Sequence, residues 1–221
     1  MRVIFDQRTN KGMKRMKTEK HKMLNQEYYI CWDEELTAER EKAKDLVYDF
    51  NSRKPSERME RNQIIQKLFH SVGENAWVES PFNCDYGYNI TVGDNFYANT
   101  NCTILDCAKV TIGDNVLIGP NVSLYTPNHA MDAAERKAGY ERSLPITIGD
   151  NVWLGGSVTI VPGVTIGDNA IIGAGSVVTK DIPADVIAAG VPCKVIRPIT
   201  EKDTVGLEIH AVDNDKNLTA K

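Results

Sequence analysis

The chain has 221 residues, with 26 Lys and Arg against 30 Asp and Glu, so its formal net charge is −4. Hydrophobic residues at 42% and charged residues at 25% are typical of a globular protein and exclude a disordered or fibrous chain. The small negative charge gives no general attraction to nucleic acid or to an anionic membrane. No stretch approaches the roughly 18 apolar residues of a transmembrane helix, and no signal peptide is recognised. Five cysteines without a CxxC pair indicate a reducing compartment, so we expect a cytoplasmic protein.

Charge and glycine are distributed unevenly along the chain. Residues 1–77 hold 16 Lys and Arg and 13 Asp and Glu, whereas residues 78–221 hold 10 and 17. Thirteen of the 16 glycines lie between Gly87 and Gly190. Two differently built regions are therefore expected to meet near Trp77.

The first region is typical of helix. Residues 1–15 are basic and without periodicity, so they are interpreted as a leader or disordered segment outside the fold. Between residues 34 and 50, apolar residues recur at helical spacing, which predicts an amphipathic helix. Ser56 is expected to cap a second helix that ends at Gly73. Residues 16–77 are thus predicted to form a helical cap with no catalytic residue of its own.

The second region, residues 78–202, repeats every six residues. Four near copies stand out: ITVGDN at 90–95, VTIGDN at 110–115, ITIGDN at 146–151 and VTIGDN at 164–169. Alternating aliphatic residues make a short half-buried strand, and a Gly or Asn at every sixth position tolerates the positive φ of a corner. Three strands and three corners complete a coil, and stacked coils form a triangular prism with an aliphatic interior. We therefore predict an all-β solenoid of parallel strands with a small helical cap, followed by a polar tail at 203–221.

Residues 128–145 break the hexapeptide pattern. This segment is rich in charge and alanine and carries no strand signal, so it is predicted to be a loop that protrudes from one edge of the prism. His129, the one histidine of the hexapeptide region, stands at its base. An imidazole titrates near neutral pH and can take the proton of an alcohol, which makes His129 a candidate general base.

The hexapeptides resemble those of the left-handed β-helix acyltransferases. Three stretches, CDYGYNITVGDNFYAN, GVTIGDNAIIGAGSVVTKDIP and AAGVPCKVIR, further resemble the maltose and galactoside O-acetyltransferases, and the likeness covers about residues 17–202. The resemblance implies left-handed coiling, acetyl-CoA as co-substrate without a metal, a sugar acceptor and a homotrimer. It implies direct transfer of the acetyl group with His129 as the base, and Asp85 and Asn99 as acceptor-binding residues. Residues at acetyl-CoA positions are Trp153, Gly156, Ala174, Thr179, Lys180, Lys194 and Arg197.

Independent arguments support part of that set. Lys180, Lys194 and Arg197 are among the few cations of the charge-poor region, and a phosphate-bearing nucleotide needs such partners. The developing oxyanion needs donors, for which the backbone N–H groups near Gly155 and Gly156 are candidates. Each of these residues also has a simpler interpretation, as a solvated corner residue or, for Trp153, as a packing residue.

The chain departs from the galactoside enzymes at two acceptor-binding positions. Where those enzymes carry acids, this chain has Cys31 and Cys107, and the neighbouring Asp33 and Asp106 are candidates to replace them. The run CDYGYN is more similar to the maltose type. We therefore expect glucose- or maltose-type acceptors first and galactosides second.

Three other functions compete with this interpretation. A γ-type carbonic anhydrase would need three zinc-binding histidines, but His21, His70 and His210 lie outside the hexapeptide region. An acetyltransferase for a xenobiotic or a nucleotide-sugar remains open, whereas a serine acetyltransferase carries a much longer cap. A non-catalytic β-helix scaffold is the third alternative, opposed by His129, its loop and the cations.

Overall fold

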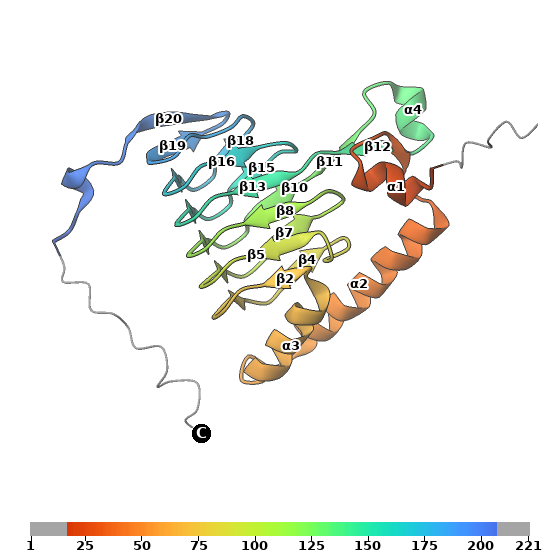
Figure 1. The fold of residues 1–221 in the computed structure, drawn as a ribbon, viewed down its shortest axis with the longest axis horizontal. Coiled ribbons are helices and arrows are strands. Elements are labelled where there is room, and N and C mark those ends of the chain that lie inside the picture. Colours follow the sequence, from red (N-terminus) through yellow and green to blue (C-terminus); the bar gives the residue numbers. More distant parts are fainter. Residues whose placement is uncertain (1–16, 207–221) are drawn as a thin grey trace, which may run out of the picture.

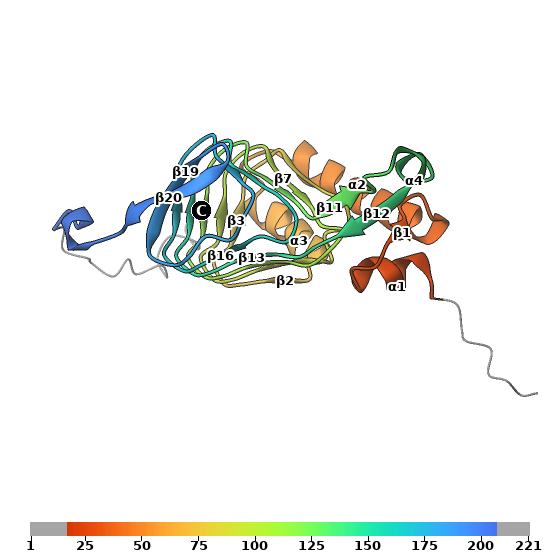
Figure 2. The ribbon, with the colours of Figure 1, turned by 90° about the horizontal axis from the view of Figure 1, so that it is seen from above.

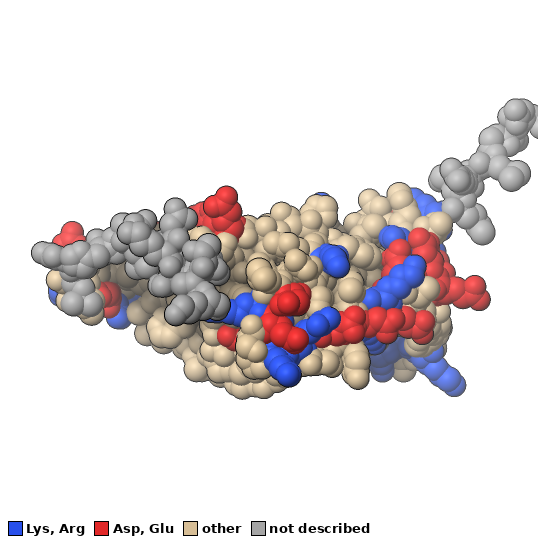
Figure 3. Space-filling view, turned by 90° about the horizontal axis from the view of Figure 1, so that it is seen from below, with Lys and Arg blue, Asp and Glu red and all other residues tan. Residues whose placement is uncertain are grey.

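The computed structural model describes residues 17–206, so the expected leader at 1–15 and the tail beyond residue 206 lie outside the described part. A stack of coils forms the body of the molecule, and helices lie against its first coils (Figure 1). The part of the chain that the structure describes holds no helix long and apolar enough to cross a membrane. On the face seen in Figure 3, charged side chains of both signs gather where the helices lie.

The helical cap consists of three helices and one short strand: α1 (Glu19–Leu24), β1 (Tyr29–Ile30), α2 (Glu34–Ser52) and α3 (Arg58–Leu68). Asp33 caps α2, because its side chain accepts a hydrogen bond from the backbone N–H of Leu36. The expected limits of the second helix are wrong. Glu57, not Ser56, precedes α3, and the helix ends at Leu68 rather than at Gly73 because the chain there turns into the first strand of the solenoid.

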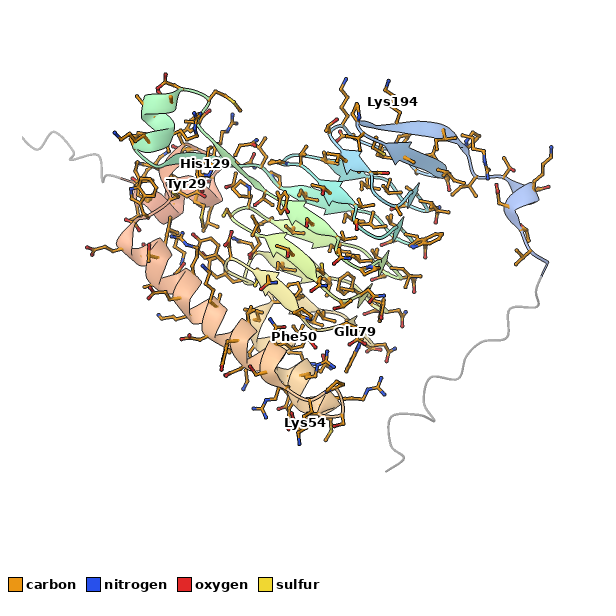
Figure 4. The ribbon with its side chains drawn as sticks, turned by 180° about the vertical axis from the view of Figure 1, so that it is seen from behind. Tyr29, Phe50, Lys54, Glu79, His129 and Lys194 are labelled. Carbon is orange, nitrogen blue, oxygen red and sulfur yellow. The ribbon has the colours of Figure 1, made fainter. Side chains whose placement is uncertain are left out.

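Arg61 attaches α3 to the first coil. Its side chain is almost completely buried, and its guanidinium donates to the carbonyl oxygen of Val78 at 3.1 Å and to Glu79 at 3.3 Å. The same guanidinium lies 5.1 Å from the ring centroids of Phe50 and Trp77. Phe50 and Glu79 mark this contact between the cap and the first coil in Figure 4.

The solenoid is a left-handed parallel β-helix of hexapeptide repeats, as predicted. Its first face contains β2 (Ser71–Val72), β5 (Ile90–Val92), β8 (Val110–Ile112), β13 (Ile146–Ile148) and β16 (Thr165–Ile166). Its second face contains β3 (Trp77–Val78), β6 (Tyr97–Ala98), β9 (Leu117–Ile118), β14 (Trp153–Leu154), β17 (Ile171–Ile172), β19 (Val186–Gly190) and β20 (Cys193–Pro198). Its third face contains β4 (Phe82–Cys84), β7 (Cys102–Leu105), β10 (Ser123–Tyr125), β15 (Thr159–Ile160) and β18 (Val177–Val178).

Aliphatic side chains fill the prism from end to end. On the first face Ile90, Val110 and Ile146 lie in register, and all three are fully buried. Each such side chain contributes about 1.5–3 kcal/mol by leaving water. β20 pairs with β19 in the antiparallel sense, which ends the series of parallel strands (Figure 2). Because β2 pairs with β5, the first coil begins at Ser71, within the 16–77 range predicted as cap.

The corner between the first and second faces, here called the GDN corner, explains the repeated sequence. It comprises residues 93–95, 113–115, 149–151 and 167–169. Each Asp side chain accepts from a backbone N–H of the coil before it, as Asp150 does from Asp114 at 2.8 Å. Each Asn has a positive φ, such as 57° at Asn151, and its side-chain amide donates to the next coil, to an Asn in three cases and to Asp185 in the case of Asn169. At the Gly position a Cβ would strike the next coil, 2.2 Å from an oxygen of Asp150 in the case of Gly113.

The segment at 128–145 is not the strandless loop that its sequence predicts. It forms a hairpin of β11 (Pro127–His129) and β12 (Tyr140–Ser143) joined through the short helix α4 (Ala133–Lys137). β12 also pairs with β1 of the helical cap, so three strands form a small antiparallel sheet at the side of the prism (Figures 1 and 2). The backbone N–H of Leu144 donates to the carbonyl of Thr126, which closes the coil beneath this excursion.

Candidate active site

His129 is the last residue of β11 and lies opposite Glu141 of β12. Its Nδ1 is 3.4 Å from Oε1 of Glu141, within the distance of an ion pair when the imidazole is protonated. The imidazole is 60% exposed, whereas the Glu141 side chain is only 13% exposed. A largely buried carboxylate thus lies against one nitrogen of the imidazole and leaves the other nitrogen to meet a substrate.

The helical cap fixes Glu141 in turn. The Tyr29 hydroxyl of β1 donates to Oε2 of Glu141 at 2.8 Å and lies 3.3 Å from the Ser143 hydroxyl. Burial raises the pKa of Tyr29 far above its ordinary value, so this phenol keeps its proton and remains a donor. Figure 4 shows Tyr29 and His129 close together beside the excursion. Nothing in the sequence pattern singled out Glu141 or Tyr29, because only the pairing of β1, β11 and β12 brings them to His129.

Asp85 is partly buried on the corner that joins the third face to the first. We call this the His129 corner; it comprises residues 85–89, 106–109, 126–145, 161–163 and 179–181. Burial raises the pKa of Asp85, and Arg40 and the Cys107 thiol oppose that rise. The Cys107 thiol lies 3.5 Å from Oδ2 of Asp85 and donates to it. Burial also keeps the Cys107 pKa well above its ordinary value, so the sulfur is a thiol, not a stand-in for a carboxylate.

The two candidates for replacing the missing acids have other roles. Asp106 is fully buried, and its carboxylate accepts backbone N–H bonds from Asp85, Tyr86 and Asn89 at 3.1, 2.8 and 3.3 Å. It therefore shapes the His129 corner and is not available to an acceptor. Asp33 is engaged as the N-cap of α2.

Arg40 of α2 is a further polar residue of this site that the sequence did not single out. Its guanidinium donates to the Tyr86 hydroxyl at 2.6 Å and to the carbonyl of Cys31 at 2.7 Å. Its charge also opposes the rise that burial causes in the pKa of the neighbouring Asp85. Burial and the nearby Glu141 carboxylate raise the pKa of Cys31 to about 11, so this residue too is a neutral thiol. In sequence Arg40 is one charge among many on an amphipathic helix, which is why its role was missed.

Asn99 lies on a different edge of the prism from His129. It stands at the corner between the second and third faces, here called the Asn99 corner, which comprises residues 99–101, 119–121, 155–157 and 173–175. Its side-chain oxygen accepts from the backbone N–H of Thr100 at 2.8 Å. Gly156 and Ala174 lie on the same corner in later coils. Within one chain, the residues of the Asn99 corner are therefore not brought to His129.

Trp153 points away from the interior. It is 52% exposed, and its neighbour Leu154 takes the buried position, so Trp153 is not a core residue. In register with it on the second face are Tyr97, Leu117 and Ile171. Leu117 is likewise half exposed, so an outward apolar column runs along this face beside the Asn99 corner.

The expected cofactor cations are distributed over the last coils. Thr179 and Lys180 lie exposed on the His129 corner, and Lys194 is exposed on β20, remote from His129 in Figure 4. Arg197 makes two hydrogen bonds to Asp203, at 2.8 and 2.6 Å, and these bonds lower the pKa of Asp203. Lys180 and Lys194 thus fit a phosphate-bearing ligand directly, whereas Arg197 would have to share its guanidinium with Asp203.

One of the expected oxyanion donors is already used. The backbone N–H of Gly155 donates to the carbonyl of Ile172 at 2.8 Å, as the ladder between coils requires. The N–H of Gly156 is the remaining candidate of the pair. Within residues 17–206, no group of three or more His, Cys, Asp or Glu side chains could hold a metal ion.

A left-handed β-helix of hexapeptide repeats places the chain in the class of hexapeptide-repeat acyltransferases. The maltose acetyltransferase hexapeptide capping motif matches residues 22–73, the succinyl-transferase hexapeptide repeat residues 109–125, and the bacterial transferase hexapeptide family residues 145–180. The chain belongs to the maltose and galactoside O-acetyltransferase family. It is 57% identical over 170 residues to the galactoside O-acetyltransferase of Escherichia coli K12, an alignment that covers 77% of this chain and 84% of that one.

Solved structures agree with this assignment. A maltose O-acetyltransferase from Clostridium difficile 630 superposes with a TM-score of 0.82 at 53% identity, over 84% of this chain and 99% of that one. A galactoside acetyltransferase in complex with coenzyme A superposes with the same TM-score at 52% identity, over 85% of this chain and 94% of that one. The predicted family and fold are therefore confirmed.

Proposed function

We propose that the protein transfers the acetyl group of acetyl-CoA to a hydroxyl of a sugar. The observation that carries this proposal is the pair of His129 and Glu141, an exposed imidazole beside a largely buried carboxylate on the long excursion at residues 126–145. The relatives named above, which include a complex with coenzyme A, support the choice of both substrates.

His129 acts as general base. With Nδ1 held by Glu141, Nε2 takes the proton of the sugar hydroxyl while that oxygen attacks the thioester carbonyl. The new C–O ester bond forms, the C–S bond breaks, and the imidazolium returns the proton to the departing sulfur. No enzyme nucleophile is needed, which agrees with thiols that are neutral at Cys31 and Cys107. The backbone N–H of Gly156 is the donor that we assign to the developing oxyanion.

Asp85 and Asn99 bind the acceptor in this proposal. The Asp85 carboxylate, held by the Cys107 thiol and facing Arg40, is suited to accept hydrogen bonds from sugar hydroxyls. Replacement of two family acids by Cys31 and Cys107 removes acceptor groups from the pocket, and for this reason we place glucose or maltose before galactosides. A nucleotide-sugar or a xenobiotic hydroxyl is the second candidate.

We further propose that the active site is shared between neighbouring chains of a cytoplasmic homotrimer. His129, Asp85 and Lys180 lie on one corner of the prism, whereas Asn99, Gly156 and Ala174 lie on another. A neighbouring chain that places its Asn99 corner against the His129 corner of the first chain would complete the set of proposed site residues. The exposed apolar column of Trp153 and Leu117 beside that corner is suited to such a contact. Five free cysteines agree with a reducing cytoplasm.

The test is a steady-state assay of CoA release with glucose, maltose and a thiogalactoside as acceptors. With the best acceptor, His129→Ala is expected to lower kcat by about 10²- to 10⁴-fold, the usual contribution of a general base. His21→Ala, a histidine exposed on α1, is the matched control and is expected to keep wild-type kcat. Unchanged kcat in His129→Ala would refute the role of the base. Turnover with an amine or antibiotic, but with no sugar, would refute the acceptor assignment alone.

A further inference from the structure

A cavity of about 710 Å³ lies between the helical cap and the first face of the prism. Helices α1, α2 and α3 form one side, and residues of β5 and β8 form the other. Its volume lies in the range of small-molecule sites, about 300–1,000 Å³. Neither His129 nor any of the residues expected to bind acceptor or acetyl-CoA lines it. The proposed acetyl transfer therefore leaves this cavity without a role.

The charge of the cavity is opposite to that of the chain. The cavity is lined by four lysines and His70: Lys20 of α1, Lys42 of α2, Lys67 of α3 and Lys109, the last residue of the His129 corner before β8. Glu39 is the one carboxylate among the lining residues, although the chain as a whole has a net charge of −4. Four separate segments thus bring a lysine to the same concave surface. The like charges repel one another, and a bound anion would offset that repulsion.

The single carboxylate does not neutralise these lysines. Glu39 forms an ion pair with Lys20 and accepts a hydrogen bond from the Tyr88 hydroxyl at 2.8 Å. Within residues 17–206, Lys42, Lys67 and Lys109 form no ion pair with any carboxylate. Three exposed ammonium groups around one cavity are therefore available to a ligand.

The remaining lining residues are apolar or carry hydroxyl groups. Leu46 and Leu68 provide aliphatic surface, the Tyr88 ring lies under the Lys20 ammonium at 5.2 Å, and Thr91 and Thr111 add hydroxyls from the first face. A ring-shaped body can pack on such a surface while its charged groups reach the lysines. We propose that this cavity binds a small organic anion with two or more negative charges and a ring-shaped body, the chemistry of a nucleoside monophosphate.

The cavity and the candidate active site share one wall. The Tyr86 side chain lines the cavity, while its hydroxyl accepts from Arg40 on the side of Asp85. Tyr86 and Tyr88 also contact each other, with ring centroids 5.3 Å apart. The anion site is thus adjacent to the acceptor residues but separate from them, so its occupation can be measured independently of catalysis.

The experiment is a calorimetric titration of the full-length protein with AMP in the absence of CoA, because CoA carries a nucleoside phosphate of its own and would compete for the cavity. AMP is expected to bind, and adenosine, which lacks the phosphate, to bind at least tenfold more weakly. Lys42→Ala, Lys67→Ala and Lys109→Ala are each expected to weaken AMP binding by about three- to tenfold, since each removes one charge near the phosphate. Added NaCl should weaken binding of AMP but not of adenosine.

Lys54→Ala serves as the matched control, because Lys54 is an exposed lysine of the same cap that does not line the cavity. It is expected to bind AMP as the wild type does, and Lys109→Arg, which keeps the charge, to bind within about twofold of it. No heat of binding with AMP would overturn the proposal. Equal affinity for AMP and adenosine, or lysine variants indistinguishable from Lys54→Ala, would overturn it as well.

Discussion

Glu141 is the residue through which the helical cap reaches His129. One carboxylate oxygen contacts Nδ1 of the imidazole, and the other accepts from Tyr29 of β1. Glu141 does not touch the substrates in our proposal and is a positioning residue. In this role Glu141 orients the imidazole so that its other nitrogen faces the acceptor, and it stabilises the imidazolium that forms.

We expect Glu141→Gln to lower kcat by about tenfold or more and to leave KM for the acceptor nearly unchanged, because the amide keeps the bond from Tyr29 but loses the negative charge. Steady-state kinetics with the best sugar measures both constants. Glu135→Gln, an exposed carboxylate on α4 of the same excursion, is the control and should behave as wild type. A rise in KM alone, with kcat intact, would show that Glu141 binds acceptor instead.

Asp106 predicts a pH dependence of stability. Burial raises its pKa from the ordinary 3.8 to about 6, despite the backbone N–H bonds from Tyr86 and Asn89 that lower it. Between these two values the folded protein holds a proton that the unfolded chain releases. The stabilisation is therefore complete below about pH 4 and is lost as the pH rises through about 6, by up to about 3 kcal/mol.

Denaturant unfolding at pH 4, 5, 6 and 7 tests this prediction. Asp106→Asn cannot titrate, so its free energy of unfolding should lack the fall that the wild type shows over this range. Asp45→Asn, at an exposed position on α2, should retain the wild-type profile. Parallel profiles for wild type and Asp106→Asn would mean that Asp106 keeps its ordinary pKa in the fold.

The sequence could identify His129 but not the residues that support it. His129 was recognisable because it stands where the hexapeptide pattern stops and because imidazole suits proton transfer. Glu141 lies beside His129 because β11 pairs with β12, and Tyr29 contacts Glu141 from 112 residues away in sequence; no local sequence pattern encodes either pairing. Asp106 was a candidate to replace a missing acid because it precedes Cys107 in sequence, whereas in the fold the backbone N–H groups of Tyr86 and Asn89 occupy both of its carboxylate oxygens.

At the level of elements, the GDN corner links sequence and fold most directly. Gly leaves space for the next coil, Asp accepts a backbone N–H, and Asn adopts the positive φ of the turn. The repeated sequence therefore allowed the corner to be predicted. Asn151 combines a left-handed φ of 57° with side-chain bonds to the Asn residues of both adjacent coils.

Two substitutions at this position separate the contributions. Asn151→Gly loses the side-chain ladder but tolerates the left-handed backbone, and we expect a loss of about 1 kcal/mol. Asn151→Ala loses the ladder and adds backbone strain of about 1–2 kcal/mol, so it should be the less stable of the two. Thermal unfolding of both variants gives the order. If Asn151→Ala unfolds at or above the temperature of Asn151→Gly, backbone conformation does not select Asn here.

The excursion is the element that the sequence described least well. Its strands, β11 and β12, contain PNH and YERS and so lack the aliphatic alternation that marks a buried strand. They form because β12 pairs on both sides, with β11 and with β1 of the cap, and not because a face enters the core. Backbone pairing of this kind leaves no periodic signal, and the segment was accordingly predicted as a loop.

For the whole molecule, the His129 corner and the Asn99 corner lie on different edges of the prism. A site shared between chains can therefore be tested by mixing chains that are each impaired at one of the two corners. If each site takes His129 from one chain and Asn99 from the next, a random trimer of His129→Ala and Asn99→Ala chains contains about a quarter of intact sites. We expect co-refolding of the two impaired variants to restore activity to about that fraction of wild type. The measurement is CoA release under saturating substrates.

Each variant refolded alone is the control and should stay inactive. Activity of the mixture no higher than the mean of the two variants would place the site within one chain. Sedimentation of the wild type as a stable monomer would contradict the trimer directly.

The excursion leaves and rejoins the coil at one point, where Leu144 bonds Thr126. The stack therefore closes without it, and the register of Ile146 on Val110 depends on the coil alone. The proposed base and the stack are thus carried by separable pieces of chain in this protein. An evolving sequence could lengthen, shorten or exchange the hairpin that bears His129 while inheriting the stack unchanged, so new acceptors are reachable without a new fold.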